Sequence, residues 1–188
     1  MRGEQFAKAL RGKLILQVRR WGKQLWFEMK APPHPLFHFG MASAFRTGHA
    51  PALQLKSGPL VTDDAWPPRF TKIRLWLDDG GELVMTDARS FGRILLRDDP
   101  LHQSPIANLG FDLFLALPSL AVFGQRITAR AVSIKTLLLD RRFCAGIGNW
   151  IADEILYQAR IDPRRRGNTL STAEIAVIRM KLKSIVSI

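Results

Sequence analysis

Short runs in which apolar and polar positions alternate dominate the first part of the chain, and this spacing is typical of β-strands. The clearest run covers residues 71–77, where every second residue from Ile73 onward is aliphatic. Asp78-Asp79-Gly80-Gly81 then predicts a hairpin turn before a returning strand at 82–86. Further runs of strand character are 13–19, 24–29 and 36–39. We therefore predict an antiparallel β-sandwich or barrel within residues 1–110.

Residues 111–188 show helical spacing instead. Ser171 and Glu174 form a capping box, and apolar residues follow at helical intervals at Ile175, Ile178, Leu182 and Ile185. Other helices are predicted from about Pro118-Ser119, over 134–139, and from Trp150 to about Arg160 with Asn149 as N-cap. The chain is thus predicted to be an α+β protein, with a β-sandwich lobe at 1–110 followed by a helical lobe at 111–188.

The charge balance indicates that this protein binds polyanions. Lys and Arg number 28 against 16 Asp and Glu, which gives a net charge of +12 and a sequence pI of about 10.8. This excess favours nucleic acid over the alternative of a solvated basic face. No run of 18 apolar residues is present, so no membrane span is expected.

Cysteine and histidine usage argues against a metal site. Cys144 is the single cysteine, and the four histidines lack the spacing of zinc ligands. We expect no metal and no cofactor, and we expect a chain that occupies a reducing, intracellular compartment.

The turn Ala145-Gly146-Ile147-Gly148-Asn149 is the first candidate binding site. Its two glycines allow close approach of another molecule, and a helix N-terminus attracts anions. Six arginines flank the turn at positions 141, 142, 160, 164, 165 and 166, so we favour a DNA phosphate as the ligand. An ordinary helix–helix turn is the alternative, and the local pattern also fits a helix-hairpin-helix.

Three weaker candidates lie in the β-rich part. Lys23, in a predicted hairpin tip, could hold a phosphate or could simply be solvated. Met41 and Phe91 could fill the space that a flipped nucleotide vacates, and Arg89 could contact the orphaned base. Read alone, Met41 and Phe91 are better explained as core residues.

Taken together, these segments resemble the formamidopyrimidine-DNA glycosylase and endonuclease VIII family. The strongest resemblance lies in the helical part, which is similar to the helix–two-turn–helix DNA-binding module of that family. The matching segments are 134–140, 145–156 and 159–163 in the helical part, and His38-Phe39-Gly40-Met41 and 86–92 in the β-rich part. Pro32-Pro33-His34-Pro35 and Trp66-Pro67-Pro68 are more similar to the fungal and plant branch.

The resemblance implies a bilobal base-excision-repair enzyme that removes oxidised purines such as formamidopyrimidine and 8-oxoguanine and then cleaves the abasic site. Its partner would be double-stranded DNA carrying an oxidised base or an abasic site, bound by a monomer, in the nucleus if the source is a eukaryote. By this resemblance Lys23 and Asn149, with Gly146 and Gly148, hold phosphates. Met41, Arg89 and Phe91 fill the vacated space.

The start of the chain departs from the resemblance. The nucleophile of the family is an N-terminal proline followed by glutamate, whereas this chain begins Met1-Arg2-Gly3. We therefore expect an N-terminally truncated chain with no catalytic residue of its own and no zinc finger. Three hypotheses follow: an incomplete glycosylase and abasic-site lyase, a non-catalytic damaged-DNA-binding protein, or a weak lyase that uses the amine of Lys23 or of Met1.

Overall fold

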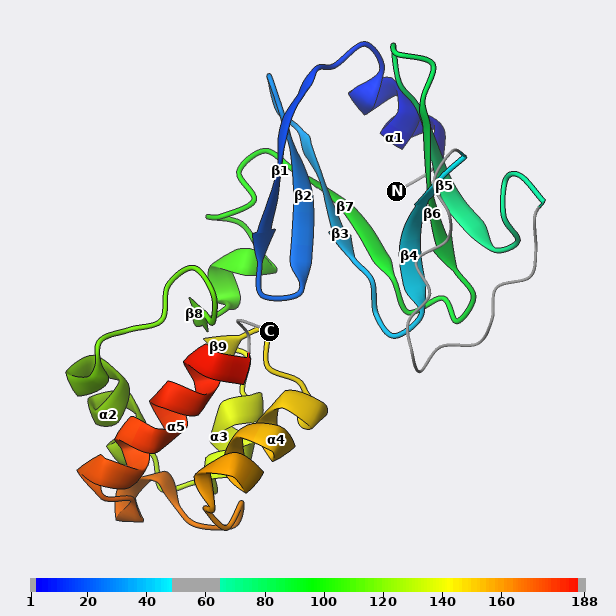
Figure 1. The fold of residues 1–188 in the computed structure, drawn as a ribbon. Helices are drawn as coiled ribbons and strands as arrows, with labels where there is room; N and C mark the ends of the chain where they lie inside the picture. Colours follow the sequence, from blue (N-terminus) through cyan, green and yellow to red (C-terminus); the bar gives the residue numbers. More distant parts are fainter. Residues whose placement is uncertain (1–2, 49–64, 186–188) are drawn as a thin grey trace. The chain divides into compact units, whose positions relative to one another are not determined.

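The computed structural model describes residues 3–48 and 65–185, in which short strands precede a set of helices (Figure 1). The strands are β1 (Ile15–Trp21), β2 (Gln24–Met29), β3 (His34–His38), β4 (Ser43–Thr47), β5 (Thr71–Trp76), β6 (Glu82–Asp87), β7 (Arg93–Arg97), β8 (Phe111–Asp112) and β9 (Cys144–Ala145). The α-helices are α1 (Gly3–Leu10), α2 (Leu120–Thr128), α3 (Ile134–Leu139), α4 (Asn149–Ala159) and α5 (Thr172–Ile185). Two short 3₁₀ helices are η1 (Ile106–Asn108) and η2 (Gly167–Thr169).

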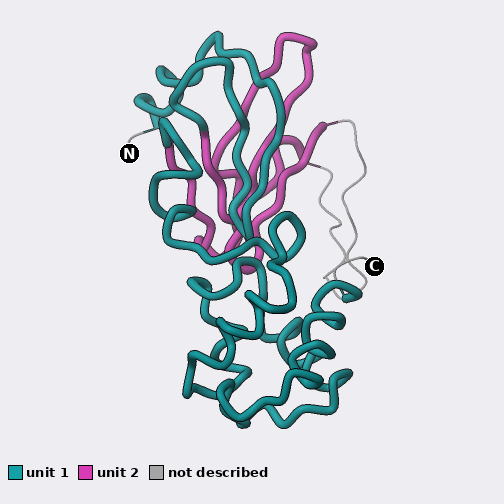
Figure 2. Tube along the Cα trace, turned by 90° about the vertical axis from the view of Figure 1, so that its left-hand side faces the viewer, with its two compact units in different colours: residues 1–34, 97–188 teal, residues 35–96 magenta. Residues whose placement is uncertain are grey.

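The chain divides into two compact units that do not follow its order (Figure 2). Unit 1 joins residues 1–34 to residues 97–188, and unit 2 consists of residues 35–96. The β1–β2 hairpin therefore belongs with the helices. No helix in residues 3–48 or 65–185 is long and apolar enough to cross a membrane.

The helices of unit 1 enclose one apolar core. α5 packs against α2 and α4, and α3 packs against α4. Ile134, Ile155 and Ile178 are among the fully buried residues of this core. The capping box at the start of α5 is present, since the Ser171 backbone N donates to Glu174 Oε2 (2.8 Å) and the Glu174 backbone N donates to Ser171 Oγ (3.3 Å). The predicted helix start is confirmed.

Serine side chains also fix the starts of α2 and α3. Ser119 Oγ accepts from the backbone N of Val122, and Ser133 Oγ accepts from the backbone N of Thr136. Each bond satisfies one of the N–H groups that a helix start leaves without an intrahelical partner. The start of α2 confirms the prediction at Pro118-Ser119, and α3 has the predicted bounds.

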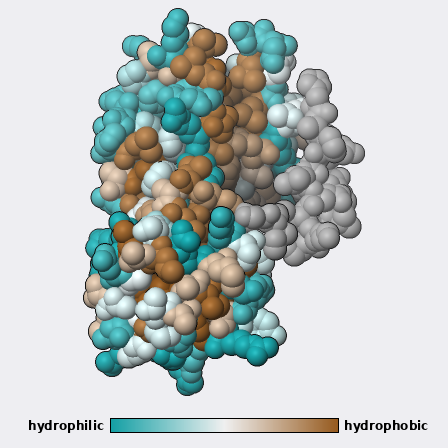
Figure 3. Space-filling model, turned by 60° about the vertical axis from the view of Figure 1, so that its left-hand side comes forward, coloured by the Kyte–Doolittle hydropathy of each residue, from teal (hydrophilic) through white to brown (hydrophobic). Residues whose placement is uncertain are grey.

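Exposed apolar side chains gather at the start of β1. Leu14, just before the strand, and Leu16 and Val18 within it are more than half exposed. Figure 3 shows hydrophobic side chains reaching one surface of the molecule between hydrophilic ones. The hairpin pairs Trp21 with Gln24 and Arg20 with Leu25 near its tip, and its register shifts between Ile15 and Gln17.

Unit 2 contains the predicted β5–β6 hairpin within a three-stranded antiparallel sheet of order β4-β6-β5. β3 and β7 are neighbours in another sheet. Phe37 on β3 is fully buried, and its ring meets that of Phe45 on β4 edge-on at 5.0 Å between centroids. Val84 and Met85 on β6 are also buried. The predicted α+β class with antiparallel sheets is confirmed, whereas α1, β4 and β7 are elements that the sequence reading did not identify.

Candidate nucleic-acid interface

The tip of the β1–β2 hairpin lies directly against the 144–148 turn. Gly22, at this tip, has φ +57°, a conformation that glycine adopts without strain. A Cβ on Gly22 would lie 2.9 Å from the Cβ of Ala145 and 3.2 Å from the backbone N of Gly146. Only glycine therefore permits this approach between the two segments.

Asp112 at the end of β8 holds the hairpin tip in place. Its buried carboxylate accepts hydrogen bonds from both terminal nitrogens of Arg20 (2.9 and 3.1 Å) and from the backbone N of Gly22 (2.5 Å). The backbone N groups of Phe114 and Leu115 donate to the same carboxylate at 2.8 and 2.9 Å. Burial opposes ionisation of Asp112, but the bonds from Gly22 and Arg20 outweigh it and lower the pKa of the carboxyl.

The 144–148 turn is anchored from its other side. β9 pairs in parallel with β8, so that Cys144 lies opposite Phe111 and Ala145 lies opposite Asp112. Gly146 follows with φ +107°, which turns the chain toward α4. The strand that carries Asp112 thus fixes both the hairpin tip and the turn.

This docking brings Lys23 to the start of α4. Lys23 Nζ lies 3.5 Å from the carbonyl oxygen of Ile147, 124 residues along the chain, and a Cβ on Gly148 would lie 2.7 Å from Nζ. Partial burial, and then the positive charge of Arg141, lower the pKa of Lys23. The four residues predicted to bind phosphate, Lys23, Gly146, Gly148 and Asn149, therefore lie together.

The prediction of Asn149 as N-cap is wrong. Gly148 is the N-cap, with an extended backbone (φ −118°, ψ 175°) and no side-chain cap, and Asn149 is the first residue of α4. The first intrahelical bond runs from the backbone N of Ala152 to the carbonyl of Gly148 (2.9 Å). Because the side-chain amide of Asn149 does not cap the helix, this amide can bind a ligand together with the backbone N–H groups of the first turn of α4.

Unit 2 brings the other three predicted site residues together. Gly40 has φ +58°, and a Cβ there would lie 2.7 Å from the carbonyl of Phe91, so the 38–41 turn packs against the 88–92 loop. Met41 is 73% exposed and Phe91 53% exposed, and the Arg89 guanidinium lies 5.3 Å from the centre of the Phe91 ring. The reading of Met41 and Phe91 as core residues is wrong, because both side chains reach solvent.

The loop that carries Arg89 and Phe91 is held by Asp87 at the end of β6. The buried Asp87 accepts a hydrogen bond from the backbone N of Gly92 (2.8 Å). Burial acts against ionisation, but the bond from Gly92 counters it, and the pKa of Asp87 is lowered. Phe91 therefore stands on a braced loop, and Met41 stands on the turn that packs against it.

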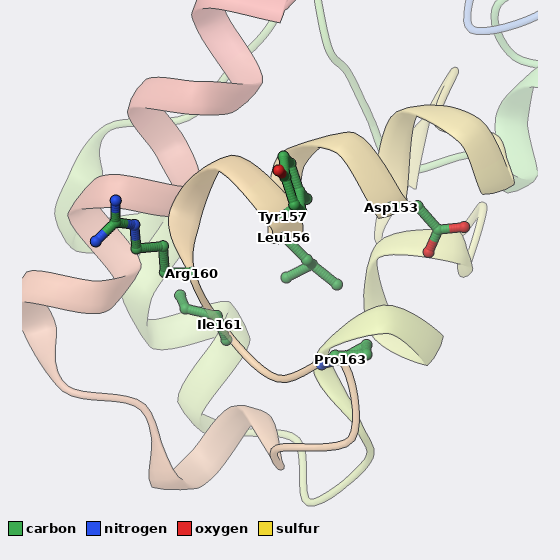
Figure 4. A pocket seen from close by; sticks show the side chains of 6 residues that line it. All are labelled: Asp153, Leu156, Tyr157, Arg160, Ile161 and Pro163. Atoms are coloured by element: carbon green, nitrogen blue, oxygen red, sulfur yellow. The ribbon is translucent and has the colours of Figure 1, made fainter.

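A shallow depression of about 450 Å³ lies at the other end of α4 (Figure 4). Leu156 and Ile161 supply its apolar lining, and Tyr157 and Arg160 stand at its edge. It contains none of the residues predicted to bind phosphate or to fill the vacated space.

Sequence reasoning missed Arg20 and Asp112 as site residues. A signal was available, since Asp112 is a lone acid inside the apolar stretch 111–117. A carboxylate in such a stretch is seldom buried without a cationic partner.

Two family models cover most of the chain. The formamidopyrimidine-DNA glycosylase N-terminal domain matches residues 1–94, and the formamidopyrimidine-DNA glycosylase H2TH domain matches residues 109–188. The chain belongs to the formamidopyrimidine-DNA glycosylase family. The resemblance described from the motifs is confirmed.

Curated relatives in this family include plant and bacterial proteins. A formamidopyrimidine-DNA glycosylase of Arabidopsis thaliana is 38% identical over 181 residues, which are 96% of this chain and 46% of the relative. The protein of the same name from Desulfitobacterium hafniense is 34% identical over 90% of this chain and 58% of its own length. The chain thus spans about half the length of the curated relatives it matches.

Solved structures of the same family share the fold. Lactococcus lactis formamidopyrimidine-DNA glycosylase, non-covalently bound to DNA that contains an abasic site, aligns with a TM-score of 0.79 at 24% identity. That alignment covers 98% of this chain and 66% of the other. The MutM protein from Thermus thermophilus aligns with a TM-score of 0.76 at 28% identity over 96% of this chain and 61% of the other.

Proposed function

We propose that this chain is a base-excision-repair DNA glycosylase and abasic-site lyase homologue that acts on oxidised purines in duplex DNA. The observation that carries the proposal is the convergence of Lys23 with the Gly146–Asn149 turn in unit 1. Membership of the formamidopyrimidine-DNA glycosylase family supports it. The compartment would then be one that contains DNA, the nucleus if the source is a eukaryote.

A DNA phosphate fits the chemistry of this cluster. The ammonium of Lys23, the N–H groups at the start of α4 and the amide of Asn149 are all donors, and an anion accepts from each of them. Burial, and then the positive charge of Arg141, lower the pKa of Lys23, and the two cations repel until an anion lies near both. A phosphate would relieve that repulsion.

The exposed cluster of unit 2 would act on the bases. We propose that Met41 and Phe91 enter the space left by a flipped nucleotide and that Arg89 contacts the orphaned base. The exposure of Met41 and Phe91 supports this role, because exposed apolar side chains on two segments that pack together are available for insertion into a base stack.

The functional division of the chain is proposed to lie near residue 110, with domains at 1–110 and 111–188. One family model ends at residue 94 and the other begins at residue 109, which supports this division. The compact units differ because Asp112 and the 144–148 turn bind the β1–β2 hairpin to the helices.

Binding is tested with a duplex that carries a tetrahydrofuran abasic-site analogue and an undamaged duplex of the same sequence. We expect a lower Kd for the damaged duplex, and affinity for both should fall steeply with salt because phosphate contacts release counterions. Lys23→Ala should raise Kd and reduce the slope of log Kd against log salt by about 1. Equal Kd values for the two duplexes, or a Kd that does not change with salt concentration, would contradict the proposal.

A non-catalytic damaged-DNA-binding protein is the second candidate. The residues of the interface favour it, because each of them is proposed either to bind DNA or to fill the space left by a flipped nucleotide, and none is proposed to react. Incubation with an abasic-site duplex and borohydride separates the two candidates. A covalent adduct means that an amine of this chain forms the Schiff base, whereas retained binding without an adduct supports the non-catalytic role.

The amine of Lys23 can be examined in the same assay. Its lowered pKa increases the neutral fraction, and the neutral amine is the form that attacks a carbonyl. If Lys23→Ala traps as much adduct as the wild type, Lys23 is not the nucleophile.

A further inference from the structure

The first turn of α4 exposes a tryptophan for which the fold of unit 1 gives no reason. Trp150 is 71% exposed, whereas Ala152, Ile155 and Leu156 on the other side of the helix are buried in the core. A buried tryptophan would contribute strongly to stability, but this one contributes little. Its apolar surface is therefore available to a ligand.

Trp150 stands next to the proposed phosphate site. It follows Asn149 and is two residues from Gly148, the glycine against which Lys23 Nζ lies. Side chains of an α-helix lean toward its N-terminus, and the proposed phosphate site lies at the N-terminus of α4. Both Trp150 and Lys23 belong to unit 1.

The polar atom of the indole is available as well. Among residues 3–48 and 65–185, no hydrogen bond engages Nε1 of Trp150, whereas Nε1 of Trp21 donates to the carbonyl of Gly110 and Nε1 of Trp66 donates to Glu82. An indole N–H can only donate. The partner that it lacks must be an acceptor.

We propose that Trp150 is a further DNA-contact residue of this interface. Its Nε1–H donates to a backbone phosphate oxygen beside the phosphate that Lys23 holds, and its ring packs on the adjoining deoxyribose. A nucleic-acid backbone presents this combination of an acceptor and an apolar sugar face, and most protein–DNA hydrogen bonds go to it. The inference rests on the proposed function, since it assigns a new residue to the same DNA site.

The chain supplies a matched control on the same helix. Tyr157 is also aromatic and is 81% exposed, but it lies seven residues further along α4, about 10 Å away at 1.5 Å per residue. It borders the depression at the far end of the helix (Figure 4). Removal of Tyr157 removes a comparable exposed ring without touching the proposed site.

The test measures Kd for the tetrahydrofuran duplex with the full chain and its variants. Trp150→Ala should raise Kd about tenfold, the equivalent of about 1.4 kcal/mol, and Trp150→Phe, which keeps a ring but loses the donor, should give a smaller rise. Tyr157→Ala should leave Kd unchanged. Because the indole is neutral, Trp150→Ala should keep the wild-type salt slope, whereas Lys23→Ala reduces it.

The outcomes separate this inference from the proposed function. If wild-type protein binds the damaged duplex tightly and Trp150→Ala binds it equally well, Trp150 is not a contact and the proposed function stands. An equal loss in Trp150→Ala and Tyr157→Ala also overturns the inference, because the effect would then not be local. Absence of salt-dependent binding by the wild type overturns both. Circular dichroism of each variant verifies that α4 and its neighbours remain folded.

Discussion

At the scale of single residues, Asp112 connects the segments of the interface, a role that its position in the sequence does not indicate. It is fully buried. Its carboxylate accepts hydrogen bonds from the side chain of Arg20, from the backbone N–H of Gly22 in the same hairpin, and from the backbone N–H groups of Phe114 and Leu115. A buried carboxylate is stable only when such donors replace its hydration. Asp112 therefore positions Lys23 without contacting the proposed ligand.

Asp112→Ala is expected to destabilise unit 1. The change leaves Arg20 and the N–H groups of Gly22 and Phe114 without their acceptor, which should lower the free energy of unfolding by about 2–3 kcal/mol. The midpoint of urea denaturation measures this. Asp98→Ala, which also removes an exposed carboxylate, serves as control and should leave the midpoint unchanged. If the urea midpoint is the same for both variants, the hydrogen bonds of Asp112 do not stabilise the fold.

The same residue predicts a dependence on pH. The pKa of Asp112 is lowered in the folded state, so its stabilising effect is complete above the ordinary pKa of aspartate, about 3.9, and is lost as pH falls through the lower folded value. Wild-type stability should thus fall on acidification in this range more than that of Asp112→Asn. Parallel acid profiles for the two proteins would contradict the lowered pKa.

Gly148 makes a different prediction, which concerns binding rather than stability. Its φ of −118° suits alanine, but the new Cβ would meet Lys23 Nζ at 2.7 Å and displace the ammonium, which is the free end of a flexible side chain. Gly148→Ala should therefore fold normally and bind the damaged duplex more weakly. Gly124→Ala in α2, whose Cβ would meet its nearest atom at 3.8 Å, is the control that should bind as the wild type does. Wild-type affinity in Gly148→Ala would argue against the placement of Lys23.

At the scale of elements, helices with caps and regular spacing were predicted well, and short elements without either were not. α5 follows from Ser171 and Glu174, whose capping bonds are local in the sequence, and α3 has the range that was predicted, 134–139. β7 is an apolar run of only three residues between two arginines, a pattern that does not separate strand from helix. α1 carries apolar residues at helical spacing, Phe6, Ala9 and Leu10, which are partly buried, but the run is too short to be told apart from its neighbourhood by pattern.

The exposed apolar residues at the start of β1 predict poor solubility of the isolated chain. Leu14, Leu16 and Val18 are close together in the sequence and more than half exposed. Leu16→Thr with Val18→Thr should reduce concentration-dependent light scattering while the urea midpoint changes little, because both side chains are already exposed. Lys72→Thr, on β5, is the control and should leave scattering as it is. Unchanged scattering in the double variant would mean that β1 does not drive association.

At the scale of the whole molecule, the two compact units do not coincide with the β-rich and helical parts of the sequence. The β1–β2 hairpin is part of the β-rich stretch by sequence, yet it belongs to unit 1 with the helices. Arg20, Gly22 and Lys23 cause this, since each contacts a residue of the helical part. The hairpin thereby carries its lysine to the start of α4.

The sequence by itself determined what depends on near neighbours: the alternation of strands, the caps of α2, α3 and α5, the net charge, and the motifs that indicated the family. Only the tertiary structure decided that Lys23 meets Gly148, that Asp112 binds Arg20, and that Met41 and Phe91 are exposed. The first two join residues 92 or more positions apart, and the last depends on which surfaces are covered. Local propensity does not encode such contacts, because they arise from packing of elements that are distant in the sequence.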